Sequence, residues 1–103
     1  MHLLGDMMRV SPYLKNEILQ ASQKAFGDSR LVLFGSRVDD SRHGGDFDIA
    51  VFTDMNLNDF KRAKVQFFKH MILRDLDIPI DLILYTHANP LLRDEIDKKG
   101  IEI

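Results

Sequence analysis

Apolar residues recur at helical spacing in three segments of the chain, and each segment follows a typical helix N-terminus. In the first, Ser11-Pro12 supplies a hydroxyl N-cap followed by proline, which predicts a helix over 12–26. The second begins at Asn56 or Asn58 and predicts a helix of about 57–74. Its inner stripe is expected to consist of Phe60, Ala63, Phe67 and Met71.

Three short apolar runs lie between the helical segments and predict strands. They cover Arg30 to Phe34, Asp46 to Phe52 and Ile78 to Tyr85. Asn89-Pro90 repeats the cap-plus-proline signal after the last run, so a short third helix is expected from Leu91 to Lys99.

The predicted element order is αβ(α)βαβα, with a short helix after the first strand. This order is typical of an α/β (α+β) domain with a small mixed β-sheet flanked by helices. Pro79, near the start of the third strand, indicates a sheet edge or a strand entry. We expect residues 1–11 to form an N-terminal arm or short helix, and not a signal peptide, because this segment carries Asp6 and lacks a basic region and a small-residue cleavage site. Residues 12–103 then form a single domain.

Composition narrows the functional classes. The 103 residues correspond to one small domain, and the net charge of −2 gives no reason to expect direct nucleic-acid binding. The chain has no cysteine, which excludes disulfides and thiolate metal sites and fits the cytoplasm. No apolar run approaches the roughly 20 residues of a membrane-spanning helix.

Two aspartates open the second predicted strand. Side chains alternate along a strand, so Asp46 and Asp48 share one face and stand about 6–7 Å apart at Cα. A divalent cation such as Mg²⁺ would relieve their repulsion, since carboxylates are its preferred protein ligands. The alternative is that both lie at the surface and pair with Arg37, Arg42 or Lys61.

A third aspartate, Asp81, interrupts the last apolar run. Because side chains alternate along a strand, Asp81 is expected on the face opposite Ile80 and Leu82. Burying a lone aspartate without a partner costs free energy. If the second and third strands are neighbours, Asp81 lies beside Asp46 and Asp48, and a two-metal site becomes plausible. The alternatives are a salt bridge to a buried arginine, or an edge position that faces water.

The first strand ends in Gly35-Ser36, where it is expected to turn into the short helix. Backbone N–H groups at such a turn bind anions, and glycine allows a phosphate to approach closely. Arg37 adds a guanidinium beside them. Arg42 and His43 lie in the following turn, and their roles stay open.

The combined pattern resembles the DNA polymerase β-type nucleotidyltransferase superfamily. Its motif here reads Phe34-Gly35-Ser36, then Asp46-Phe47-Asp48-Ile49, and later "IPIDLILY" as the strand of the third carboxylate. "LFGSR" and the tail "NPLLRDEIDKKGIEI" are similar to the minimal nucleotidyltransferases, or MNT proteins. The resemblance covers about 12–103. Gly44-Gly45 departs from the family's usual serine at this turn.

This resemblance implies transfer of a nucleotidyl group. A nucleoside triphosphate, usually ATP, would bind with its phosphates against Gly35-Ser36. Asp46 and Asp48 would hold two Mg²⁺ ions, and Asp81 would hold the one that activates the acceptor hydroxyl. Positioning and charge neutralisation, which such a transfer needs, are what these residues offer.

The resemblance also implies a partner, because MNT proteins typically act with an all-helical HEPN protein that is often encoded by the adjacent gene. The expected function is that of an antitoxin, which transfers AMP to a tyrosine of the HEPN toxin. The alternatives are a nucleotidyltransferase with a small-molecule acceptor, or a non-catalytic subunit that only masks its partner. Candidate contact segments are Leu3 to Met8 and Phe67 to Ile72, for which ordinary core packing is the competing interpretation.

Overall fold

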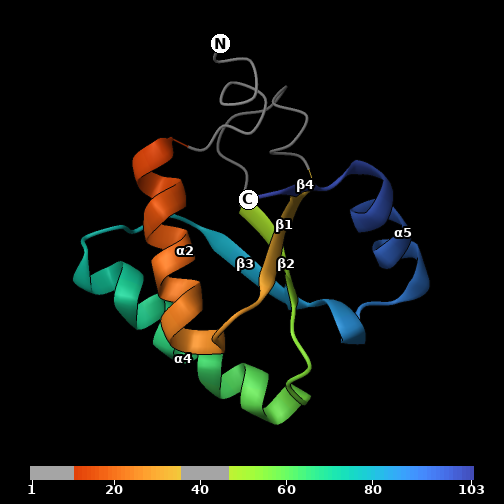
Figure 1. Ribbon diagram of the computed structural model, residues 1–103, viewed down its shortest axis with the longest axis horizontal. Helices are drawn as coiled ribbons and strands as arrows, with labels where there is room; N and C mark the ends of the chain where they lie inside the picture. The colour runs from red at the N-terminus through yellow and green to blue at the C-terminus, as the bar shows by residue number, and fades with distance from the viewer. Residues whose placement is uncertain (1–10, 36–46) are drawn as a thin grey trace.

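In the computed structural model, which describes residues 11–35 and 47–103, four strands form one mixed sheet with the order β3–β2–β1–β4. β1 runs antiparallel to both β2 and β4, whereas β2 and β3 are parallel (Figure 1). The expected small mixed sheet is therefore confirmed. The strands are β1 (Arg30–Phe34), β2 (Phe47–Phe52), β3 (Ile80–Leu84) and β4 (Ile101–Glu102).

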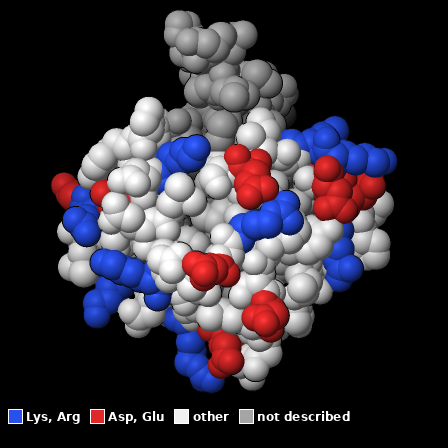
Figure 2. Space-filling view, in the orientation of Figure 1, with Lys and Arg blue, Asp and Glu red and all other residues white. Residues whose placement is uncertain are grey.

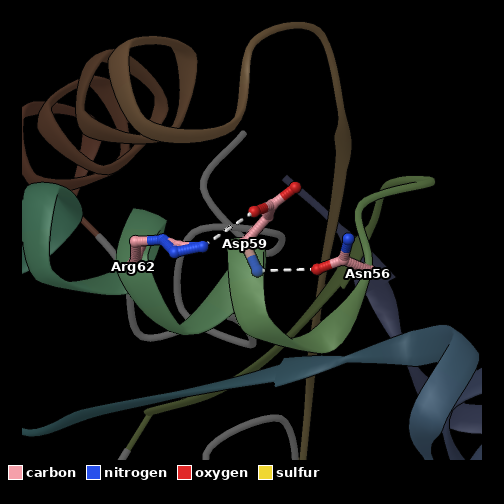
Figure 3. Close-up of polar contacts among 3 residues, drawn as sticks. All are labelled: Asn56, Asp59 and Arg62. Atoms are coloured by element: carbon pink, nitrogen blue, oxygen red, sulfur yellow. Dashed lines mark hydrogen bonds and ion pairs between the residues drawn. The ribbon is translucent and has the colours of Figure 1, made fainter.

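The three predicted helices form, and side chains cap them where the sequence indicates. The helices are α2 (Pro12–Phe26), α4 (Leu57–Leu73) and α5 (Pro90–Lys99). The Ser11 hydroxyl accepts a hydrogen bond from the Leu14 N–H at 3.1 Å. Asn56, not Asn58, caps α4, and its side-chain oxygen accepts from the Asp59 N–H at 2.8 Å (Figure 3). Asn89 caps α5 in the same way.

Two strand predictions need correction at their ends. β3 begins at Ile80 and stops at Leu84, because Tyr85 leaves the sheet to start the short 3₁₀ helix η1 (Tyr85–His87). β4 was not predicted, since two residues carry no periodic pattern and depend on pairing with β1. The strand expected from Asp46 begins at Phe47 in the described chain, and Asp46 and the short helix expected after β1 lie outside the described residues.

Pro79 marks a strand entry at a sheet edge, as predicted. β3 is an outer strand of the four, and Pro79 lies just before its first residue. The Pro79 carbonyl accepts a hydrogen bond from the Phe47 N–H at 3.0 Å. This bond joins the starts of β2 and β3.

The two faces of the sheet carry different layers. α2 and α4 pack together on one face, and α5 lies on the other (Figure 1). The α2–α4 side holds the main core, and all four residues of the predicted inner stripe of α4 are buried in it. From the strands, this core takes Leu31, Leu33, Phe47, Ile49, Val51, Leu82 and Leu84. The α5 side holds a smaller cluster of Val32, Phe34, Ala50 and Ile96.

A buried acid joins α2 to α4. The Glu17 side chain is only 9% exposed, and its Oε1 lies 3.1 Å from Nε2 of the buried His70. The Arg74 Nε lies 3.7 Å from the same oxygen. Burying a carboxylate is costly, and these two partners offset that cost. Within the described part of the chain, no helix is long and apolar enough to cross a membrane.

Candidate active site

Asp48 and Asp81 lie side by side on neighbouring strands. In the parallel pairing of β2 with β3, Asp48 is the register partner of Asp81. Paired residues point to the same face, and adjacent strands are about 4.8 Å apart, so the two carboxylates leave the sheet together on the α5 side. The fold thus joins two residues that are far apart in the sequence.

Asp81 is solvent-exposed, and not buried within the apolar run as its position in the sequence suggested. The expected burial cost does not arise, because β3 is an edge strand and the side chain faces water. Of the alternatives considered, the edge position is the one observed. The alignment of Asp81 with the half-buried Asp48 is independent of this point.

Gly35 brings the end of β1 against the Asp48 carboxylate. Phe34, the residue before it, is the register partner of Asp48 on the antiparallel side. Gly35 has φ of 84°, a conformation that residues with a side chain rarely adopt. A Cβ built on Gly35 would meet Asp48 Oδ2 and would lie 3.3 Å from Asp48 Cγ. Only glycine fits here without displacing that carboxylate.

Several predicted site residues lie outside the described residues, namely Ser36, Arg37, Asp46, Arg42 and His43. Within residues 11–35 and 47–103, no three His, Asp or Glu side chains form a group that could hold a metal ion. The described part of the site therefore consists of Gly35, Asp48 and Asp81.

The opposite end of the same sheet face carries an aromatic stack that the sequence analysis did not single out. Phe52 lies four residues after Asp48 and Tyr85 four after Asp81, and their ring centroids are 4.1 Å apart. The Arg30 guanidinium lies 4.5 Å from the centroid of the Phe52 ring. Equal spacing from the two aspartates was the signal in the sequence, since it places both rings on the face of the carboxylates.

Tyr85 is tied to α5 through its hydroxyl. This hydroxyl donates to the Asp97 carboxylate, whose oxygens lie 2.8 and 3.0 Å away. The hydrogen bond to Asp97, with smaller effects of burial and of the Asp97 charge, raises the pKa of Tyr85 above its ordinary value. The stack packs beside a hollow of about 250 Å³ between β1, β4 and α5, and we assign it a structural role.

At the end of the sheet face that holds Asp48, Asp81 and Gly35, the geometry suits a cation bound to phosphate. Aligned carboxylates offer the oxygen ligands that Mg²⁺ prefers, and Mg²⁺ usually takes only one or two of them from the protein. Because Gly35 has no side chain, the Asp48 carboxylate can lie directly against the backbone at the end of β1. Residues 14–103, which include Gly35, Asp48 and Asp81, match the family model described as polymerase beta, nucleotidyltransferase.

The chain belongs to the polymerase β nucleotidyltransferase family. No curated protein sequence matches it closely enough to add to this assignment.

Solved structures share the nucleotidyltransferase fold. A chain of a toxin–antitoxin complex with AMP-PNP is 23% identical, with a TM-score of 0.68 over 85% of this chain and 70% of that one. A mutant MntA–HpeT toxin–antitoxin complex gives 21% identity and a TM-score of 0.66, again over 85% and 70%. A complex of tri-AMPylated Shewanella oneidensis HEPN toxin with MNT antitoxin gives 23% and 0.60, over 85% and 66%. At these identities the likeness shows the fold.

Proposed function

We propose that this nucleotidyltransferase transfers AMP from ATP to a hydroxyl, most specifically to a tyrosine of a helical HEPN-type partner, and so acts as an antitoxin. The alignment of Asp48 with Asp81 beside Gly35 carries the proposal. Membership of the nucleotidyltransferase family supports the reaction class. The reaction is placed in the cytoplasm, where ATP and Mg²⁺ occur together.

The donor set fits Mg²⁺. Asp48 and Asp81 would hold the metal from the described residues, and Asp46 and Asp48 together would hold two ions in the family pattern. Bound there, Mg²⁺ would neutralise phosphate charge and lower the pKa of the acceptor hydroxyl. All of these ligands are carboxylates, whose oxygen atoms this hard cation prefers.

The glycine turn would position the nucleotide. Gly35 would keep the Asp48 carboxylate in position for the metal and phosphates, because a side chain there would meet and displace that carboxylate. In the proposed roles, Ser36 donates a hydrogen bond to a phosphate oxygen and Arg37 adds positive charge. Holding the phosphates in place supplies most of what such a transfer needs.

The proposed step is an in-line substitution at the α-phosphorus of ATP. The acceptor oxygen forms a bond to this phosphorus, and the bond to pyrophosphate breaks. The hydroxyl proton passes to the Asp81 carboxylate. Asp81 is exposed on an edge strand, so even a hydroxyl on the surface of a large protein can reach it.

The choice of acceptor and partner rests on the structural neighbours. One of them contains AMP-PNP, and another contains an AMPylated HEPN toxin together with an MNT antitoxin. These complexes share the fold of this chain, and they support a protein hydroxyl as acceptor and a toxin as partner.

The test is transfer of label from α-labelled ATP in the presence of Mg²⁺ and the protein encoded by the adjacent gene. We expect the label on a tyrosine of that protein. Asp48→Asn and Asp81→Asn should each lower the rate at least about 100-fold, because each removes a charge needed in the transition state. Asp54→Asn, at an exposed aspartate after β2, is the matched control and should leave the rate unchanged.

Each other outcome has a clear meaning. Undiminished transfer by Asp81→Asn would contradict the role of Asp81. Label on a small molecule would favour the small-molecule acceptor. A stable complex with no pyrophosphate release would favour a subunit that only masks its partner.

A further inference from the structure

α4 carries a second stripe of residues, separate from the one buried in the core. Leu57, Val65 and Ile72 are 38%, 64% and 69% exposed. With Lys61 and the half-buried Phe68 they follow one another at helical spacing along a single face. We call these five residues the α4 stripe. Phe68 links the stripe to the core, because its ring meets that of the buried Phe67 edge to face at 5.3 Å.

A hollow continues the α4 stripe at the C-terminal end of the helix. It has a volume of about 330 Å³ and is lined by Ile72, Asp75, Leu76 and Asp77. Its two apolar and two acidic side chains suit a basic side chain, whose stem would pack on Ile72 and Leu76 while its charge faces the carboxylates. Stripe and hollow together form one continuous surface.

Positive charge dominates the helix around the stripe. Lys61, Arg62, Lys64 and Lys69 are all on α4, and Figure 2 shows Lys and Arg side chains along the lower left of the molecule, where Figure 1 places this helix. Of these four, Arg62 alone forms an ion pair within the described residues, with Asp59 at 3.4 Å (Figure 3). A complementary partner therefore carries acidic side chains beside an apolar ridge.

The hollow is close to the candidate site along the chain, although α4 covers the opposite face of the sheet. The hollow ends at Asp77, and Asp81 follows four residues later, a distance of at most about 13 Å along an extended chain. β3 is the edge strand, so the described chain places no further strand between this surface and Asp81. A protein seated here can present a hydroxyl to Asp81 by reaching around the sheet edge.

We infer that the α4 stripe and the hollow are the docking surface for an amphipathic helix of the acceptor protein. This helix has an apolar ridge against Val65, Phe68 and Ile72, acidic side chains toward Lys61 and Lys64, and a basic side chain in the hollow. The inference rests on the proposed function for the identity of the acceptor. It adds the surface that holds the acceptor and the side-chain chemistry that recognises it.

A second copy of this chain fits the surface poorly. Two α4 helices set antiparallel about Val65 would place Lys61 of one copy opposite Lys69 of the other. A parallel pair would place each lysine against its counterpart. Like charges in contact disfavour both arrangements, so the charge pattern points to a different, acidic partner.

The experiment measures binding of the adjacent-gene protein by calorimetry, with the full chain and its variants. The double variant Val65→Asp with Ile72→Asp should weaken binding at least about 30-fold, because it places charges among apolar anchors. Leu91→Asp is the matched control, since Leu91 is an apolar residue on α5 that is 84% exposed. Its affinity should stay within about threefold of the wild type.

A charge reversal provides an independent variant. Lys61→Glu with Lys64→Glu should weaken binding and reduce its dependence on salt. Thermal unfolding of each variant establishes that it is folded. Val65, Ile72 and Lys61 are exposed, whereas Lys64 is half-buried and lies 5.8 Å from the Phe60 ring centroid, so the unfolding measurement matters most for the lysine variant.

The outcomes separate the docking surface from the reaction. Unchanged binding by the folded Val65→Asp, Ile72→Asp variant overturns the inference, whatever the transfer activity. Weakened binding by this variant supports the docking surface even if the wild-type complex transfers no label. A wild-type chain that dimerises through the stripe, as measured by sedimentation, or one that shows no affinity for the adjacent-gene protein, also overturns the inference.

Discussion

The two faces of the sheet are built from the same strands but differ in how deeply their side chains are buried. On β2, Phe47, Ile49 and Val51 point to α2 and α4, and each is at most 4% exposed. The alternate residues Asp48, Ala50 and Phe52 point to the α5 side, where only Ala50 is buried. One face therefore holds most of the buried apolar core that stabilises the domain, while the other carries the charged groups available for chemistry.

The largest effect is expected from the stabilising face. Phe67 is 0% exposed at the centre of the α2–α4 core. Phe67→Ala should lower the free energy of unfolding by about 3–5 kcal/mol, because it removes buried apolar surface and leaves a cavity. Denaturant unfolding measures the change. Ile72→Ala, at an exposed position of the same helix, should alter stability by less than about 0.5 kcal/mol. Equal losses of stability for the two variants would contradict the central place of Phe67 in the core.

Glu17 tests whether the stabilising face depends on a buried carboxylate. Glu17→Ala should cost about 1–3 kcal/mol, because it leaves His70 buried without its partner. Asp94→Ala serves as control, since it removes an exposed ion pair with Lys98 that contributes little. A loss for Glu17→Ala no larger than that for Asp94→Ala, measured by thermal unfolding, would show that the buried pair is dispensable.

Alanine variants of two glycines with positive φ distinguish a loss of stability from a loss of nucleotidyl transfer. Gly35 and Gly27 have φ of 84° and 73°, so alanine at either should cost about 1–2 kcal/mol of stability. Nothing lies within 4 Å of a Cβ on Gly27, whereas one on Gly35 meets the Asp48 carboxylate. Gly35→Ala should therefore also abolish nucleotidyl transfer, and Gly27→Ala should not. Equal activities in the label-transfer assay would remove Gly35 from the site.

The smallest effect is expected for the pKa of Tyr85, which stacks on Phe52 on the α5 side of the sheet. Asp97 raises the pKa of Tyr85, so Asp97→Asn should move the Tyr85 titration to lower pH. The folded state holds this proton more tightly than the unfolded chain does. The stabilisation is therefore present below the ordinary pKa of about 10 and is lost as pH rises through the raised value. Tyrosinate absorbance in a Tyr13→Phe background measures the shift; an unchanged midpoint would contradict this cause.

Local chemistry made most of the fold predictable from the sequence. The caps at Ser11, Asn56 and Asn89 act within their own helical turns, so neighbouring residues suffice to locate them. The inner stripe of α4 follows from its period. β4 could not be predicted in this way, because Ile101–Glu102 forms a strand only through its pairing with β1.

The candidate site was predictable only in part. Alternation placed Asp81 on the face opposite Ile80 and Leu82, but it could not show that Asp81 is exposed, since that depends on β3 being the outer strand. The buried Glu17 was missed because a glutamate on an amphipathic helix resembles an ordinary surface residue. Its partner His70 comes from a helix 53 residues away.

The main-chain bond from Phe47 to Pro79 ties β2 to β3 next to the two aspartates. The relative placement of the two Cα atoms is therefore set by the backbone ladder. Sliding β3 by a single residue would carry Asp81 to the opposite side of the sheet. Asp48 and Asp81 therefore lie on the same face only in the observed register of β2 and β3.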